Sequence, residues 1–182
     1  GYGDCDGAAS NGCETSLADD VANCGGCAVR CGAPNSRVSC AGGACTVTGC
    51  AGGFWDLDGD NANGCEYACT PRGTSDPIDD TFTDDNCDGV DGERASLVFV
   101  APDGTGDPAC GLDPSNACAT ISLGVARAAA TGRRGVLVAA GTFPEVITLV
   151  SGVGVYGGYD RTFAARCGST SVTGGVSAGL SV

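Results

Sequence analysis

The sequence contains no lysine, no histidine and no methionine, and all nine of its basic residues are arginine. Histidine and methionine are ligands that soft and borderline metals prefer, so their absence argues against copper binding. Long apolar runs are also missing, since none approaches the roughly 20 residues that a helix needs to span a bilayer. We therefore expect neither a copper protein nor one inserted in a membrane.

Positive charge is scarce: 22 acidic residues stand against nine arginines, which gives a net charge of −13. Residues 1–93 carry 17 of the acidic residues and only three of the arginines. Phosphate binding needs clustered cations, so we expect no nucleic-acid partner. Clustered carboxylates favour hard cations instead, and calcium is the cofactor that this composition predicts.

Cysteine is abundant, with 14 residues, eleven of which lie between Cys5 and Cys87. This density is typical of a disulfide scaffold in an oxidising compartment, so we expect a secreted, extracellular or cell-surface protein. The even count permits complete pairing. Since the cysteine content indicates export, we expect Gly1 to follow a segment, such as a signal peptide, that this sequence does not include.

Three regions follow one another along the chain. Residues 1–69 have few large apolar side chains, so disulfides must replace a core, each contributing about 2–4 kcal/mol. Residues 70–94 form an acidic connector in which proline and glycine interrupt regular structure. Residues 95–182 change to short apolar segments. The expected fold class is mainly β, with an irregular disulfide-rich module first.

The third region predicts one helix among short strands. A strand is expected at residues 96–102, followed by a helix with Thr120 as N-cap and Gly132 as its C-terminal stop. The buried helix face is expected to hold Ile121, Val125, Ala128 and Ala129. Further strands are expected at residues 135–143, 145–150, 152–159, 170–176 and 179–182. Short apolar strands without polar alternation favour a β-solenoid over a sandwich or barrel.

An acidic motif of eleven residues occurs twice, as DCDGAASNGCE at Asp4–Glu14 and as DLDGDNANGCE at Asp56–Glu66. Seven of the eleven positions are identical. Both copies are predicted to form the same turn, held at their shared cysteine (Cys13, Cys65).

Alternate acidic residues in this motif can direct their oxygens at one calcium ion. The second copy offers the ligands Asp56, Asp58, Asp60, Asn63 and Glu66. The first copy has Ala8 in place of the third acid and offers Asp4, Asp6, Asn11 and Glu14. We expect the second copy to bind calcium better, whereas the first fits a structural Asx-Gly turn equally well.

The connector contains another calcium motif, DDNCDGVDGE, which begins with the alternate spacing of an EF-hand loop and has glycine at the sixth position. The expected ligands are Asp84, Asn86, Asp88, the Val90 C=O, and Asp91 or Glu93. Asp91 or Glu93 must close the site because Ala95 occupies the twelfth position, where an EF-hand loop has its glutamate. The alternative is a solvated acidic turn with Asx caps.

The cysteines are expected to form structural disulfides. A zinc site at Cys24, Cys27, Cys31 and Cys40 is the alternative by spacing, and a redox CGGC motif would need a flanking strand and helix. Local bonds are predicted for Cys69–Cys87 and Cys110–Cys118. Because Leu57 replaces the second copy of Cys5, Cys5 and Cys50 are expected either to pair with each other or to link successive chains.

Two parts of the chain resemble known families. The pattern GYGDCDGAASNGCETSLADDVANCGGCAVRC resembles Cys-rich repeats found in tandem in secreted and surface proteins of some bacteria, and IDDTFTDDNCDGVDGE resembles their metal-binding motif, of the type Asp-x-Asn-Cys-Asp-Gly. The segment from FVAPDGTGD to GVGVYGGYD resembles the N-terminal cap and first rungs of a right-handed parallel β-helix. The resemblance implies a β-helical start with one short capping helix.

These features favour a non-enzymatic extracellular structural protein, stabilised by calcium and disulfides. An open rung would present unpaired strand edges, so we expect a head-to-tail homo-oligomer or filament. The alternative is a fragment of a β-helical polysaccharide-active enzyme or a carbohydrate-binding adhesin, with a surface polysaccharide as partner. Arg161 and Arg166 are expected to solvate a cap or pair with acids rather than act in catalysis.

Overall fold

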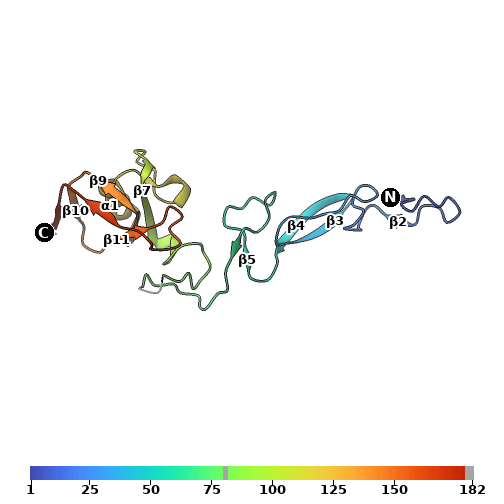
Figure 1. The fold of residues 1–182 in the computed structure, drawn as a ribbon, viewed down its shortest axis with the longest axis horizontal. Coiled ribbons are helices and arrows are strands. Elements are labelled where there is room, and N and C mark those ends of the chain that lie inside the picture. The colour runs from blue at the N-terminus through green and yellow to red at the C-terminus, as the bar shows by residue number, and fades with distance from the viewer. Residues whose placement is uncertain (80–81, 179–182) are drawn as a thin grey trace. The chain divides into compact units, whose positions relative to one another are not determined.

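The computed structural model describes residues 1–79 and 82–178 and divides the chain into two compact units, Gly1–Thr70 and Pro71–Val182 (Figure 1). It consists mainly of strands, with one α-helix and six disulfide bonds, which confirms a mainly β, disulfide-rich protein. The segment expected to be a connector is part of the second unit. The strand predicted at residues 179–182 lies outside the described residues.

The first unit is a series of three antiparallel strand pairs, β1–β2, β3–β4 and β5–β6. Their bounds are Tyr2–Gly3, Thr15–Ser16, Ser36–Ala41, Ala44–Cys50, Phe54–Trp55 and Tyr67–Ala68. The long hairpin β3–β4 turns at Gly42 and Gly43, whose φ angles are +62° and +82°. Glycine adopts positive φ without steric cost, so this pair suits a two-residue hairpin turn.

Cystines form the interior of the first unit, as the scarcity of large apolar residues predicts. The buried cluster consists of Cys24, Cys31 and Cys40, with Val38 packed against it. Four bonds are present within this unit: Cys5–Cys27, Cys24–Cys40, Cys31–Cys45 and Cys50–Cys65. All four thiols of the alternative zinc set are therefore used in disulfides.

The expectation for Cys5 and Cys50 is wrong. Cys5 is bonded to Cys27 and Cys50 to Cys65, so the two neither pair with each other nor remain available to link chains. The physical reason is that Cys50 ends strand β4 beside the second acidic loop. That loop brings Cys65 to it, a neighbour that spacing alone does not reveal.

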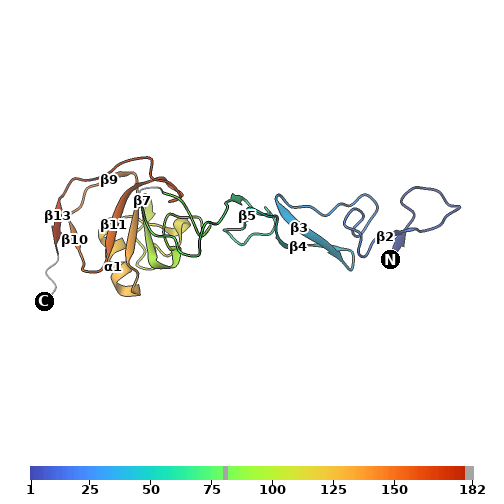
Figure 2. The same cartoon turned by 90° about the horizontal axis from the view of Figure 1, so that it is seen from below.

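The second unit contains seven strands and the helix α1. The strands are β7 (Leu97–Thr105), β8 (Gly135–Ala139), β9 (Gly141–Phe143), β10 (Ile147–Leu149), β11 (Gly154–Tyr159), β12 (Thr170–Val172) and β13 (Val176–Ala178). The 3₁₀ turn Arg94–Ser96 directly precedes β7, and the 3₁₀ turn Pro114–Asn116 lies within the loop closed by the Cys110–Cys118 disulfide. Every ladder between these strands is parallel, in the orders β7–β8–β11, β9–β12 and β10–β13. Figure 2 shows β10 and β13 side by side.

Helix α1 (Ile121–Thr131) has the predicted ends. Thr120 Oγ1 accepts from Leu123 N–H at 3.2 Å, and Gly132 has the left-handed φ of +71° that stops the helix. The predicted face is wrong at one position, because Ala129 is exposed and Gly124 is buried instead.

The core of the second unit lies on both faces of the sheet β7–β8–β11. One face packs valines of β7 and β8 against α1, and the other packs Phe99 and Leu137 against Tyr159 and Phe163. Val90, from the acidic segment, is fully buried in the second cluster. This packing fixes the acidic segment onto the sheet and so positions its carboxylates.

Candidate metal-binding loops and disulfide framework

The two acidic motifs lie in hairpins that repeat each other at an interval of 52 residues. Strands β1 and β2 pair Tyr2 with Ser16, and strands β5 and β6 pair Phe54 with Ala68 at the equivalent positions. A backbone hydrogen bond one position further closes both hairpins, at 2.8 Å in the first and 3.0 Å in the second. The duplication therefore covers the whole hairpin rather than the eleven-residue motif alone.

The first aspartate of each loop holds the following turn. Asp4 Oδ1 accepts from Gly7 N–H at 2.8 Å, and Asp56 Oδ1 accepts from Gly59 N–H at 2.7 Å. Both glycines have positive φ, +73° and +74°. The two loops thus share one Asx-turn geometry, which confirms that both copies form the same turn.

The final glutamate closes each loop. Glu14 Oε1 accepts from Cys5 N–H at 3.2 Å, and Glu66 Oε1 accepts from Leu57 N–H at 2.8 Å. The group used is the backbone N–H, which every residue except proline provides. Leucine can therefore replace cysteine here without changing the loop.

Three carboxylates gather in each loop, with oxygen atoms within 4.8 Å of one another. The two sets are Asp4, Asp6 and Glu14, and Asp56, Asp58 and Glu66. Hydrogen bonds from the Ala8 and Asp60 N–H groups, and then from the neighbouring asparagines, lower the pKa values of Asp6 and Asp58. Ionised, converging oxygens are ligands that calcium accepts.

The remaining predicted ligands of these loops support the turn. Asn11 Nδ2 donates to Asp6 Oδ2 at 3.0 Å, and Asn63 Nδ2 donates to Asp58 Oδ2 at 2.9 Å. Asp60 Oδ1 accepts the backbone N–H two residues further on, at 3.0 Å. In this arrangement both copies offer the same three carboxylates, so Asp60 gives the second copy no additional one.

A third carboxylate group lies in the second unit and is much less exposed. Asp76, Asp84 and Asp88 have oxygens within 4.8 Å of one another, and Asp76 and Asp84 are only 2% and 8% exposed. Asp84 and Asp88 were predicted ligands, whereas Asp76 was not. Its only sequence signal is the acidic segment SDPIDD, which stands outside the EF-hand-like spacing.

Hydrogen bonds satisfy only some of the carboxylate oxygens in the group of Asp76, Asp84 and Asp88. Asp84 accepts from Asp88 N–H at 3.1 Å and from Gly89 N–H at 2.7 Å, and Asp76 Oδ2 accepts from Gly92 N–H at 2.9 Å. Asp76 Oδ1 is buried and has no hydrogen-bond partner. Burial, and secondarily the charge of the neighbouring aspartates, raises the pKa of Asp76 to about 6. Burial also raises the pKa of Asp88.

Asn86 and Glu93 border this group. Asn86 Nδ2 donates to Asp88 Oδ2 at 3.2 Å and to Glu93 Oε2 at 3.4 Å, while Glu93 Oε1 accepts from Asp76 N–H at 3.0 Å. Of the two residues expected to close the site, Glu93 is therefore the one beside it. Together these side chains supply carboxylate and amide oxygens of the kind that calcium binds.

Asp91 lies elsewhere, in the core of the second unit. It is fully buried, and its Oδ2 accepts from Tyr159 O–H at 2.7 Å. Burial raises the pKa of Asp91, and the tyrosine hydrogen bond opposes that shift. The spacing that suggested a ligand could not reveal Tyr159, which is 68 residues further along the chain.

The arginines of the last region have structural contacts. Arg161 Nε donates to Asp103 Oδ1 at 2.8 Å, and its Nη1 donates to Pro114 C=O at 2.8 Å. Arg166 Nε donates to Gly157 C=O at 2.9 Å. Arg161 lines an open pocket of about 320 Å³ next to Tyr159. The prediction that Arg161 pairs with an acid is confirmed.

The disulfide framework leaves two exposed cysteines unbonded, Cys13 and Cys167. The predicted bond Cys110–Cys118 is present. Cys69 and Cys87 are both disulfide-bonded, as the prediction for them requires. The prediction that the shared cysteine holds both turns is therefore wrong for the first copy, because Cys65 is bonded to Cys50 whereas Cys13 is free.

Comparison of the chain with family models, curated proteins and solved structures gives no match. Among the described residues, no helix has the length and apolarity required to cross a membrane.

Proposed function

We propose that the protein is a non-enzymatic, extracellular structural protein in which disulfides and calcium replace a large core. The observation that supports calcium best is the buried group of Asp76, Asp84 and Asp88, with its unpartnered Asp76 Oδ1. Gathering buried carboxylates without a cation costs free energy through desolvation and mutual repulsion. A hard divalent cation would offset both, and calcium suits several flexible oxygen ligands better than magnesium does.

Unlike this group, the two exposed loops would be weaker calcium sites. Their carboxylates are solvated, so a bound ion must replace water that already stabilises them. We propose that they add stiffness to the Cys-rich repeat at the high calcium concentrations typical of extracellular modules.

The second unit is proposed to be the start of a right-handed parallel β-helix. Strands β8, β9 and β10 pair in order with β11, β12 and β13, all in parallel, which is the pattern of two stacked rungs. Helix α1 joins β7 to β8, and its burial against them suits a cap. Right-handed crossovers are strongly preferred for such connections.

The same rungs lead us to propose that copies of the protein assemble with one another. Among the described strands, β11, β12 and β13 each have one neighbour, so each presents an edge to which further strands can add. Head-to-tail addition of copies would build a filament. Light scattering of concentrated protein with calcium tests this, because a lone monomer under those conditions contradicts it.

Calorimetric titration with calcium tests the main proposal. We expect the Asp76→Asn variant to lose the tightest binding event while the weaker loop sites remain. Asp19→Asn is the matched control, because it removes the same charge from an exposed position outside the three carboxylate groups. Binding heat that is identical in all three proteins would overturn the buried site.

Release of unsaturated uronates from polysaccharide, with or without calcium, would instead support an enzyme.

A further inference from the structure

The repeated loops differ most at the glycine and cysteine before their closing glutamate. In the second copy Gly64 and Cys65 are buried, and Cys65 is 1% exposed. In the first copy Gly12 and Cys13 are exposed, although the side-chain hydrogen bonds within the loop match those of the second copy. One face of the repeat is therefore covered in one copy and open in the other.

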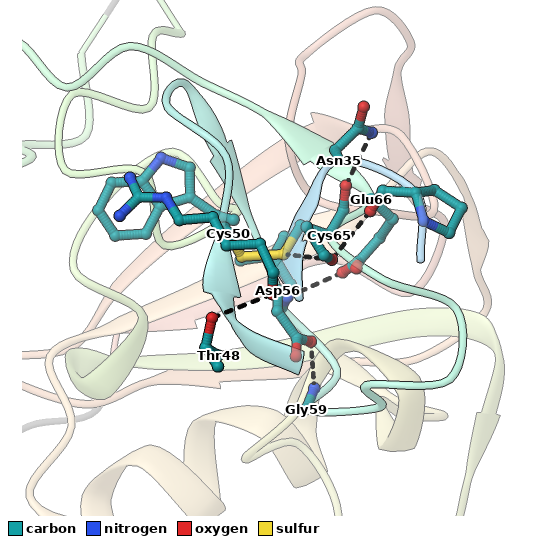
Figure 3. The surroundings of a disulfide bond; sticks show 12 residues. Asn35, Thr48, Cys50, Asp56, Gly59, Cys65 and Glu66 are labelled. Atoms are coloured by element: carbon teal, nitrogen blue, oxygen red, sulfur yellow. Dashed lines mark hydrogen bonds between the residues drawn. A yellow bond between two sulfur atoms is a disulfide. The ribbon is translucent and has the colours of Figure 1, made fainter. Parts of the chain in front are cut away.

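The hairpin β3–β4, together with the two residues that precede it, Pro34 and Asn35, covers Gly64 and Cys65 of the second copy (Figure 3). Cys65 N–H donates to Pro34 C=O at 2.9 Å, and Asn35 Nδ2 donates to Cys65 C=O at 3.0 Å. Cys50, the last residue of β4, completes the contact with its disulfide to Cys65. These contacts, a further one between Ser36 Oγ and Cys65 Sγ at 3.5 Å, and the disulfide together fix the hairpin on the loop.

Glycine is required at the centre of this contact. A Cβ at Gly64 would overlap Pro34 C=O and lie 2.8 Å from Pro34 N. Gly12 has no atom within 4 Å of the equivalent position. Gly12 has a φ of +79°, which by itself favours glycine, and the space that Gly64 leaves for Pro34 has no occupant at Gly12 among the described residues.

We propose that Gly12–Cys13 is a docking site for a further hairpin of the Pro34–Cys50 type, whose terminal cysteine forms a disulfide with Cys13. The occupant is the hairpin of another Cys-rich repeat, placed ahead of Gly1 in the same 52-residue register. The Cys50 thiol of a second copy of this chain cannot take this role without exchange, because it is already oxidised in its bond to Cys65. Each repeat thereby binds the hairpin of the repeat before it, and successive repeats become covalently linked.

The linking step is an ordinary thiol oxidation. Two thiols, Cys13 and the incoming cysteine, lose two protons and two electrons to an oxidised thiol-disulfide partner of the export compartment, which is reduced to a dithiol. The calcium sites take no part in this step, so the proposal stands apart from the proposed function.

A tandem variant tests the proposal: a second copy of Gly1–Gly52 is placed directly before Gly1 of the full chain. Eight cysteines are added, six of which have their partners within the added copy. We expect the number of free thiols to stay at two, as in the present chain, with a bond from the added Cys50 to the original Cys13. Four free thiols, or alkylation of the original Cys13, would overturn the proposal.

Matched glycine variants of the tandem protein separate docking from general damage. Gly12→Ala in the original copy should prevent the bond and leave its cysteine open to alkylation. Gly7→Ala should not, because Gly7 has a similar φ of +73° but no contact at its position or at Gly59. Equal alkylation in both variants would contradict docking at Gly12. A Cys13–Cys13 dimer would show that a second chain is the occupant and would also overturn the proposal.

Discussion

Single residues in the acidic segment show how the neighbours of a buried carboxylate distinguish a candidate ligand from a structural acid. Asp76 and Asp91 are both buried, and each has an oxygen without a hydrogen-bond partner. Asp91 Oδ2 accepts from Tyr159 O–H, whereas Asp76, whose Oδ2 accepts from Gly92 N–H, also lies beside two other carboxylates. The first arrangement suits a folded core, and the second suits a cation.

Tyr159→Phe should destabilise the second unit by about 1–3 kcal/mol, because it leaves the buried Asp91 carboxyl without its donor. Urea unfolding followed by circular dichroism measures the loss. Tyr156→Phe is the control, since it removes a hydroxyl from a less buried ring of the same strand. Equal stability of the two variants would show that the Tyr159 hydrogen bond contributes nothing.

Asp76 should make metal-free protein less stable as the pH rises from about 4 to about 7. Its pKa is about 6 in the folded state against 3.8 for the unfolded chain, so the folded state binds the proton more tightly between these values. The contribution of Asp76 to the free energy of unfolding is fully present below about pH 4 and is lost as the pH rises through about 6, by up to about 3 kcal/mol.

Unfolding of metal-depleted protein over this pH range measures the effect, and Asp76→Asn should flatten the slope. Added calcium should do the same, because the ion favours the ionised carboxylate. A wild-type slope that persists in the Asp76→Asn variant would assign the pH dependence to other groups.

The hairpins and the helix each depend on a different stabilising contact. The hairpin β3–β4 is held by cystines, so removing Cys24–Cys40 with paired alanines should cost about 3 kcal/mol, given its loop of 16 residues. Cys13→Ser is the control, because this thiol is exposed and unbonded. Thermal unfolding of both variants measures the difference, and unchanged stability without Cys24–Cys40 would contradict the cystine core.

Helix α1 depends on close packing at Gly124. Alanine is the better helix former by about 1 kcal/mol, yet a Cβ at Gly124 would overlap the Val100 side chain and lie 3.1 Å from Val136 Cγ1. Gly124→Ala should therefore destabilise the unit by about 1–3 kcal/mol. Ala129→Ser, on the exposed face, should stay within about 0.5 kcal/mol. Stabilisation by Gly124→Ala in urea titrations would show that the contact relaxes.

Features of the elements that depend on neighbouring residues could be predicted from the sequence. Thr120 and Gly132 mark the helix ends because a cap uses groups within one turn. The buried face of the helix could not be fully assigned, because Gly124 is buried by close contact with Val100, which is distant in sequence. The same holds for Asp76, which joins Asp84 only through the fold.

At the scale of the whole molecule, the chain stabilises its two units by different means. Gly1–Thr70 has a cystine interior, and Pro71–Val182 has two apolar clusters on either side of a parallel sheet. Composition predicted the cystine interior of the first unit, because large apolar residues are scarce there, but it did not predict that the acidic segment packs within the second unit. The pairing of Cys5 and Cys50 could not be predicted, because several cysteine connectivities fit the same spacing.

The most direct test of the account is a crystal structure grown with calcium, with anomalous scattering measured to identify the ion. The account predicts an ion with oxygens of Asp76, Asp84 and Asp88 at about 2.3–2.6 Å. Well-ordered carboxylates in millimolar calcium, with no ion among them, would contradict the central claim.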